Sequence, residues 1–147
     1  MARIVVEVGE TFIFKTEIPV RISDINSGHH VGNDAFVSLI HEARVRFFES
    51  LGYTEANIEG KALIISDLAV IYNSQSFYGD VLKFEINLTD FNKYGCDILY
   101  RCSHSKTNVL VLTAKTGIVF YDYTKKKVIS IPDAFKLKLN RKLGTCF

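Results

Sequence analysis

The stretch Arg21-Ile22-Ser23-Asp24-Ile25-Asn26-Ser27-Gly28-His29-His30-Val31-Gly32-Asn33-Asp34 joins two patterns of different period. Before it, over residues 11–22, apolar and polar side chains alternate, which is typical of a strand. After it, apolar residues recur at steps of three and four, which is typical of a helix. Polar, ionisable and glycine residues therefore gather where a strand ends and a helix begins, and such a junction brings free backbone N–H groups close to reactive side chains.

Residues 34–51 are predicted to form one amphipathic helix. The residues expected on its apolar face are Phe36, Leu39, Ile40, Ala43, Phe47 and Leu51. The residues expected on its polar face are Ser38, His41, Glu42, Arg44, Arg46 and Glu49. Asn33 or Asp34 is expected to cap the first turn, and Gly52 stands where a glycine commonly ends a helix.

Strands are predicted on both sides of this helix. Residues 3–8 and 11–22 form the first two, with Gly9-Glu10 as the turn between them. The later strands are residues 62–73, 81–91, 96–104 and 109–122, followed by a short one over 128–131. Most connections are short, so neighbouring strands are expected to be antiparallel. Pro132 opens a short basic C-terminal segment.

These elements predict an α+β fold, in which one long helix lies in a curved antiparallel sheet of about five or six strands. A helix of about 18 residues is roughly 27 Å long, enough to fill the concave face of such a sheet. The chain has no linker and no internal repeat, so residues 1–147 are expected to form a single domain.

Composition excludes several classes of protein. Of the 147 residues, 48% are hydrophobic, which argues against disorder, and the formal net charge of +2 gives no reason to expect a nucleic-acid partner. The three cysteines, Cys96, Cys102 and Cys146, form no Cys-x-x-Cys pair. Reduced thiols and a cytoplasmic location are therefore expected. We find no signal peptide and no apolar run of about 18 residues, so no membrane association is expected.

Three motifs resemble one known family, the hotdog-fold acyl-CoA thioesterases of the 4-hydroxybenzoyl-CoA thioesterase type. That family usually shows Arg-x-x-Asp-x-Asp-x-x-Gly-His-Val-Asn-Asn before its helix. The residues that match it here are Arg21, Asp24, His30, Val31 and Asn33. His41-Glu42-Ala43-Arg44 matches the helix motif, and the segment from Tyr72-Asn73 to Gly79-Asp80 resembles a strand followed by Gly-Asp. The resemblance covers about residues 12–122.

The resemblance implies a hotdog fold and a thioester hydrolase. Its substrate would be an acyl-CoA or an acyl carrier protein thioester, with coenzyme A as part of the substrate and no separate cofactor. It also implies a homodimer or homotetramer, with sheets joined edge to edge and acyl sites between subunits. His30, Gly32 and Asn33 are the substrate-binding residues that it suggests.

This chain departs from the family at three positions. Asn26 stands where the family usually has its catalytic Asp, His29 replaces a Gly, and Gly32 replaces the first Asn. An amide has no basic oxygen at neutral pH, so Asn26 cannot be a nucleophile or general base. Some hotdog thioesterases pair a polarising amide with a carboxylate elsewhere, often on the partner subunit, and Asn26 fits that arrangement.

Thioester hydrolysis needs an oxyanion site and a group that activates water. We expect the oxyanion site at the N–H groups near Gly32, Asn33 and Asp34, because a helix start offers free donors and a positive dipole end. Asn26 would position the water or the carbonyl. Asp24 or Asp34 would be the carboxylate, followed by Glu42.

Each carboxylate also has a purely structural interpretation. Asp34 is a good helix cap, Asp24 can pair with Arg21 or form an Asx turn, and Glu42 can pair with Arg46 one helical turn further on. His29 and His30 are expected to hydrogen-bond within the loop, since no ligand set for a metal joins them.

Two further alternatives remain at the level of the sequence. The basic residues Lys136, Lys138, Arg141 and Lys142 either meet the phosphates of coenzyme A or form a solvated, frayed tail. Asn26 leaves a second function open, a non-hydrolytic acyl-CoA-binding module. A hotdog hydratase ranks lower, because its arrangement of His and acidic residues is not found.

Overall fold

A single antiparallel sheet dominates the structure, a computed structural model that describes residues 3–144. The strands are β1 (Phe14–Pro19), β2 (Ala62–Tyr72), β3 (Val81–Thr89), β4 (Gly95–His104), β5 (Leu110–Asp122) and β6 (Lys127–Ile129). Their order is β1-β3-β4-β5-β2, with β6 paired to β5. The four later long strands match the predicted ranges to within two residues, because their alternating pattern meets clear turns on both sides.

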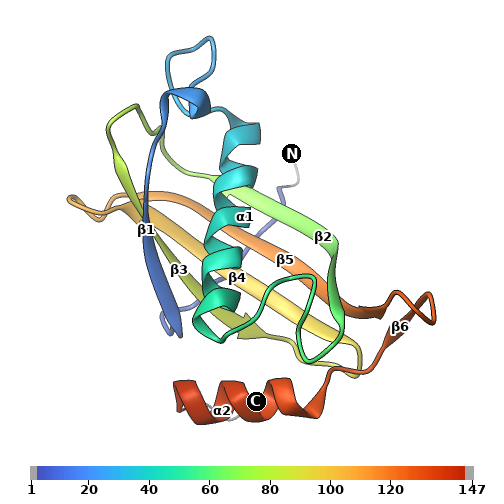
Figure 1. Cartoon of the computed structure of the whole chain (residues 1–147). Helices are drawn as coiled ribbons and strands as arrows, with labels where there is room; N and C mark the ends of the chain where they lie inside the picture. The colour runs from blue at the N-terminus through green and yellow to red at the C-terminus, as the bar shows by residue number, and fades with distance from the viewer. Residues whose placement is uncertain (1–2, 145–147) are drawn as a thin grey trace.

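The long helix α1 (Asn33–Ser50) lies on the concave face of this sheet (Figure 1). All six residues expected on its apolar face are buried. They meet inward-facing side chains of β3 and β4, among them Phe84, paired in register with Cys102, and Tyr100. The α+β architecture predicted from the sequence is therefore confirmed. Gly52 ends the helix as expected, with a φ of 82°.

One residue of the predicted polar face of α1 is placed differently. Arg44 was expected to be solvated, but it is only 7% exposed. It reaches under the helix to Tyr100 on β4, where its Nη1 is 3.5 Å from the phenol oxygen. The helical periodicity of the sequence could not predict this contact, because only the curvature of the sheet brings a hydrogen-bond partner beneath the helix.

The predicted strand over residues 3–8 is wrong. Residues 3–12 run along the outer face of the sheet without joining it, and Val5 is 77% exposed. The apolar alternation was present, but no neighbouring edge is free to pair with it at that place. The strand expected over 11–22 is shortened to β1, because the chain leaves the sheet after Pro19 and enters the 3-10 turn η1 (Ile22–Asp24).

The basic C-terminal segment is an ordered helix rather than a frayed tail. Helix α2 (Asp133–Leu143) begins after Pro132 and is followed by Gly144 in the left-handed conformation, with a φ of 63°. Phe135 and Leu139, one turn apart, are fully buried against the end of the core. Their four-residue spacing was the helix signal, and the surrounding charges obscured it.

Further structural findings concern the cysteines, the membrane and metals. Cys96 and Cys102 are free and buried, and burial raises the pKa of the Cys96 thiol to about 12. Cys146 lies outside the described residues.

Neither helix within residues 3–144 is long and apolar enough to cross a membrane. The same residues contain no group of three or more His, Cys, Asp or Glu side chains that could hold a metal ion.

Candidate active site

The junction between β1 and α1 is organised by Asp24. This carboxylate is 4% exposed and accepts hydrogen bonds from the backbone N–H of Arg21 at 2.8 Å and from its Nη2 at 3.1 Å. Its backbone carbonyl accepts the N–H of Gly32 at 3.1 Å. Asp24 thus uses both its side chain and its main chain to hold the turn, as the structural interpretation of the sequence expected.

Asn26 forms the base of the loop that leads to the helix. Its N–H donates to the carbonyl of His30 at 2.9 Å, and its side-chain oxygen accepts the N–H of Gly28 at 2.9 Å. With Oδ1 engaged, the amide NH2 is the end of the side chain that remains to donate. This nitrogen lies 3.7 Å from the position that a β-carbon on Gly32 would take, so it faces the start of α1.

The start of α1 differs from the expected cap. Gly32 is the N-cap residue, with no side-chain cap hydrogen bond, so the prediction of Asn33 or Asp34 in that role is wrong. The N–H of Gly32 is also not a free donor, because it is bonded to Asp24. Among the described residues, no partner is recorded for the N–H groups of Asn33 and Asp34, which belong to the first helical turn. The expected set of three donors is therefore reduced to two.

Glycine at position 32 leaves room for the carboxylate of Asp34. A β-carbon there would lie 2.5 Å from Asp34 Oδ1, too close for any larger residue without a shift. The exposed Asp34 side chain thus folds back over the helix start, where its charge suits the positive dipole end. Burial raises the pKa of Tyr72, and the negative charge of Asp34 raises it further.

A cavity of about 270 Å³ opens at this end of the helix. Its lining includes His30, Asn33, Phe36 and Tyr72, together with the start of the loop after β2. The Tyr72 hydroxyl donates to the carbonyl of Asn33 at 2.9 Å, and its ring lies 5.8 Å from that of Phe36. His30 Nδ1 is 3.1 Å from the Val31 carbonyl, which fixes its ring. His30 and Asn33 thus line one cavity, and Tyr72, a motif residue, joins them.

Glu42, the third sequence candidate, lies on the opposite flank of α1. It pairs with Nε of Arg46 at 2.8 Å and is half exposed. Arg46 continues the chain of contacts to β1, where its Nη1 donates to Thr16 Oγ1 at 3.0 Å and to the Glu17 carbonyl at 2.9 Å. Glu42 follows Asp34 by eight residues, or about 12 Å of helix, and it faces away from the cavity at Tyr72.

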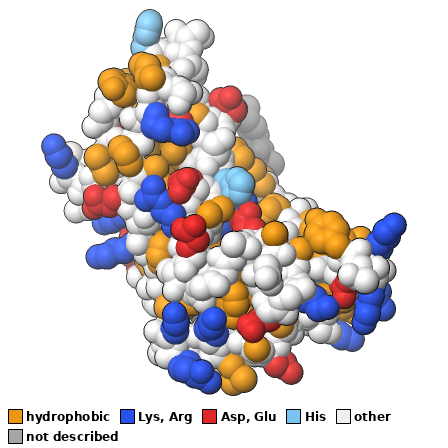
Figure 2. All heavy atoms as spheres, in the orientation of Figure 1, with side chains coloured by type: hydrophobic (Ala, Val, Ile, Leu, Met, Phe, Trp, Pro, Cys, Tyr) orange, Lys and Arg blue, Asp and Glu red, His pale blue; other side chains and the backbone are white. Residues whose placement is uncertain are grey.

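The basic residues of α2 do not lie at the end of α1 that carries the Asn26 loop. Helix α2 lies beside the C-terminal end of α1, whereas the Asn26 loop lies at its N-terminal end (Figure 1). Lys138 Nζ donates to the Leu51 carbonyl at 3.0 Å and lies 4.3 Å from the centre of the Tyr53 ring. In Figure 2, basic side chains gather over α2, at the lower end of the molecule. Within one chain, Lys138 stabilises the docking of α2.

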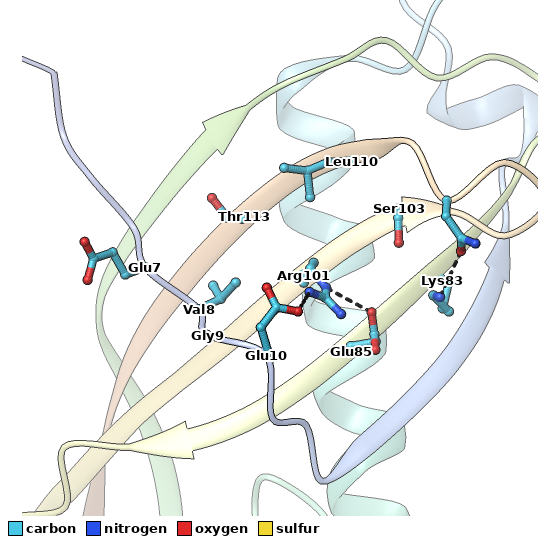
Figure 3. A pocket seen from close by; sticks show the side chains of 11 residues that line it. Glu7, Val8, Gly9, Glu10, Lys83, Glu85, Arg101, Ser103, Leu110 and Thr113 are labelled. Carbon is cyan, nitrogen blue, oxygen red and sulfur yellow. Dashed lines mark hydrogen bonds and ion pairs between the residues drawn. The ribbon is translucent and has the colours of Figure 1, made fainter.

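A larger cavity, of about 810 Å³, lies on the outer face of the sheet (Figure 3). The N-terminal segment crosses it, and Arg101 reaches from β4 to Glu10 at 2.8 Å and to Glu85 at 3.1 Å. Lys83 bonds to Asn108 at 3.2 Å. The cations in it are therefore already paired, and the whole sheet separates it from the start of α1. Its size alone does not make it the reactive site.

A family model described as the thioesterase-like superfamily matches residues 20–139, from the Asn26 loop into α2. No curated protein matches the chain at a significant level.

Solved structures share the fold. The 1,4-dihydroxy-2-naphthoyl-CoA thioesterase Slr0204 from Synechocystis is 20% identical, with a TM-score of 0.80 over 90% of this chain and 98% of its own. A DHNA-CoA thioesterase from Staphylococcus aureus is 20% identical, with a TM-score of 0.71, over 88% of this chain and 83% of its own. A thioesterase-superfamily protein from Jannaschia sp. CCS1 is 14% identical, with a TM-score of 0.78, over 91% of this chain and 85% of its own. The hotdog fold expected from the sequence is confirmed.

Proposed function

The chain belongs to the thioesterase-like superfamily, a membership that supports thioester hydrolysis, and we propose that its substrate is an acyl-CoA. The observation that carries this proposal is the start of α1. Two backbone N–H groups without a partner among residues 3–144 lie there, with the amide of Asn26 close by, next to a cavity walled by Phe36 and Tyr72.

The carbonyl of the thioester binds at these donors. As water adds to the carbonyl carbon, negative charge develops on the oxygen, and the N–H groups of Asn33 and Asp34 stabilise it together with the helix dipole. The NH2 group of Asn26 is the third donor. Gly32 contributes by its lack of a side chain, since any β-carbon would displace Asp34.

Asp34 is the intrachain carboxylate best placed for water activation. Asp24 is buried in bonds to Arg21, and Glu42 is paired with Arg46 on the other flank of the helix. Asp34 has no hydrogen-bonding partner recorded for its side chain among the described residues, and it stands over the helix start. We therefore propose that Asn26, Asp34, His30 and Asn33 together form one site for the thioester.

A second copy of the chain is proposed to complete the site by pairing along β2. This 11-residue strand ends the sheet, and only one of its edges is paired, to β5. Ile65 and Leu68, 37% and 43% exposed, give it an apolar surface that a homodimer would cover. The substrate is then held between two copies in a cytoplasmic enzyme, where Cys96 and Cys102 stay reduced, and no cofactor is required.

Turnover of a panel of aliphatic and aryl acyl-CoAs, followed by release of free thiol, tests the proposal. Asn26→Ala is expected to lower kcat by about 10²-fold, the loss typical of one oxyanion donor. The matched control is Asn87→Ala, on the outward face of β3. Absence of turnover by the wild-type protein with every acyl-CoA and with acyl carrier protein thioesters would refute the hydrolase.

Asn26 also favours one alternative, a module that binds acyl-CoA without hydrolysing it. An amide can hold a thioester carbonyl but cannot activate water. Calorimetry distinguishes the two functions, because the module would bind an acyl-CoA and release it unchanged. Free thiol appearing at a rate proportional to enzyme concentration would exclude the alternative.

A further inference from the structure

A histidine–carboxylate pair lies on the flank of α1 that faces β2. His41 Nε2 is 3.0 Å from Glu55 Oε2, and the second oxygen of Glu55 accepts a hydrogen bond from Nε of Arg44. Glu55 is thus held at both oxygens. A carboxylate fixed in this way sets the orientation and the tautomer of the imidazole that it binds.

Buried groups of the sheet support the pair from below. Arg44 is 7% exposed, and its Nη1 lies 3.5 Å from the hydroxyl of Tyr100, which is 2.8 Å from Thr116 Oγ1. Burying a guanidinium is costly unless its charge is paired and its donors are satisfied. Arg44 is paired with Glu55 and bonded to Tyr100, and this chain of contacts from Thr116 ends at His41. A buried cation therefore supports one exposed imidazole.

The other ring nitrogen of His41 remains available. With Nε2–H donating to Glu55, Nδ1 carries the lone pair, and within residues 3–144 no partner is recorded for it. The side chain is 56% exposed and lines a cavity of about 230 Å³ with Val37, Ile65 and Leu68. The Nδ1 lone pair of an oriented imidazole is therefore exposed beside β2, the unpaired edge of the sheet.

We propose that His41 of one copy is the general base for the thioester bound at the α1 start of a second copy, with Glu55 and Arg44 as positioning residues. This inference rests on the proposed hydrolase and on the dimer along β2. It assigns water activation to His41 and leaves Asp34 as a charge at the helix start.

Distance excludes the same reaction within one chain. Asn33 and His41 are eight residues apart, about 12 Å along the helix, which is more than one bridging water can span. A base at His41 can therefore serve only the helix start of another copy.

A two-fold axis beside β2 supplies that copy. Val37 is the only large apolar side chain of α1 that is exposed, and it shares its cavity with Ile65 and Leu68 of β2. A self-complementary apolar contact centres on such residues, and the two α1 helices then run antiparallel across it. Asn33 and His41 each lie four residues from Val37, about 6 Å along the axis. The start of one helix is therefore opposite His41 of the other.

The reaction balances without a further reagent. Nδ1 of His41 takes a proton from water as the water oxygen bonds to the carbonyl carbon, and the resulting oxyanion binds at Asn33, Asp34 and Asn26. When the intermediate collapses, the C–S bond breaks, and the imidazolium returns its proton to the departing thiolate. The products are a carboxylic acid and free thiol, and the three donors are unchanged.

Mixed dimers test whether His41 acts across the interface. Asn26→Ala and His41→Gln are each expected to lower kcat by about 10²-fold or more. When the two variants are unfolded together and refolded, or co-expressed, a mixed dimer carries one site with both wild-type groups. Random pairing is therefore expected to restore activity to about a quarter of the wild-type value. Restoration supports the inference, and its absence in mixed dimers verified by mass spectrometry overturns it.

The pH profile separates a base from a merely structural histidine. Within one chain, the groups facing His41 are Glu55 and Arg44, with Tyr100 behind Arg44, and the proposed dimer adds Asp34 of the second copy. The shape of the pH profile of kcat/KM is expected to differ between the wild type and His41→Gln, whereas loss of a merely structural histidine would leave that shape unchanged. Glu55→Gln should lower kcat while leaving KM within about twofold.

Glu85→Gln, which loses an ion pair to Arg101 on the outer face, is the control for loss of a surface charge pair. A His41→Gln protein that stays dimeric and retains both full kcat and the wild-type pH profile would overturn the role of His41 while leaving the hydrolase intact. An inactive wild-type protein would instead refute the proposed function.

Discussion

The two edges of the sheet differ in how they are finished. At one edge, β1 is only six residues long and contains Pro19, and Arg46 of α1 bonds to the carbonyl of Glu17. At the other, β2 is 11 residues long and carries exposed Ile65 and Leu68. Short length, proline and covering charges prevent edge pairing, whereas a long apolar edge invites it. The comparison indicates that β1 is a closed edge and β2 an open one.

The flanks of α1 repeat this difference. On the β1 side, Glu42 and Arg46 form an ion pair that ties helix to strand. On the β2 side, His41 is paired to Glu55 but keeps a ring nitrogen exposed toward the unpaired edge. The ion pair between Glu42 and Arg46 is thus complete within one chain. The imidazole proposed to act in the reaction keeps one ring nitrogen unbonded, at the edge where a second copy would bind.

The largest expected effect comes from charging the open edge. Leu68→Glu would place two like charges at the proposed two-fold contact, where they would be buried without partners, so the proposed dimer should dissociate and kcat/KM should fall by at least about 10²-fold. Light scattering after size-exclusion chromatography, with an acyl-CoA assay, measures both. Lys15→Glu on β1 is the matched control and should change neither. A dimeric, active Leu68→Glu protein would place the interface elsewhere.

Asp24→Asn tests the structural carboxylate of the junction on the β1 side. Its loss removes charge-assisted bonds to Arg21 from a buried position, so the free energy of unfolding should fall by about 1–3 kcal/mol. Urea denaturation measures the fall. The folded variant should keep kcat within about threefold. A loss of kcat as large as that of Asn26→Ala, at unchanged stability, would make Asp24 a reacting group.

Glu42→Gln on the closed flank should have a smaller effect. The pair with Arg46 is half exposed, and such pairs contribute about 0–1 kcal/mol. Unfolding should change within that range and kcat within about twofold. The same measurements on His41→Gln show the difference between the two flanks, because only that variant should lose kcat. Equal losses of kcat in both variants would contradict the difference.

The smallest effect concerns how the open strand is anchored. Lys61 precedes β2 and bonds to Asp122 at 2.8 Å, which lowers the pKa of that carboxyl to about 2, with help from the N–H groups of Lys125 and Thr124. Because the folded pKa is depressed, this contribution to stability is present above the ordinary pKa near 3.8 and is lost as pH falls toward 2. Thermal melts of wild type and Asp122→Asn should converge over that interval, and a constant difference would refute the assignment.

Much of the candidate site could be predicted from the sequence, since local chemistry places it. The loop with Asn26, the helix start with Asn33 and Asp34, and the alternating strands all follow from short-range pattern. The pairing of Asp24 with Arg21 was also foreseeable, because the two residues are three positions apart. Tyr72 was visible as part of a motif, but its bond to the Asn33 carbonyl spans 39 positions.

The errors have a common physical cause. Residues 3–8 alternate like a strand, yet they pair with nothing, because strand formation needs a free edge as well as a pattern. The basic segment at the C-terminus folds as α2 because Phe135 and Leu139 find a core to cover. The N–H of Gly32 was expected to be free, and only the folded turn shows that Asp24 occupies it.

The sequence by itself determined the long helix, the four later long strands and the residues of the Asn26 loop, because hydrophobic period and turns act over a few positions. Only the tertiary structure decided which groups meet. It buried Arg44 between Tyr100 and Glu55, set His41 on the Glu55 carboxylate and turned Glu42 toward β1. Those contacts depend on how a curved sheet carries α1, and curvature arises from the packing of the whole chain.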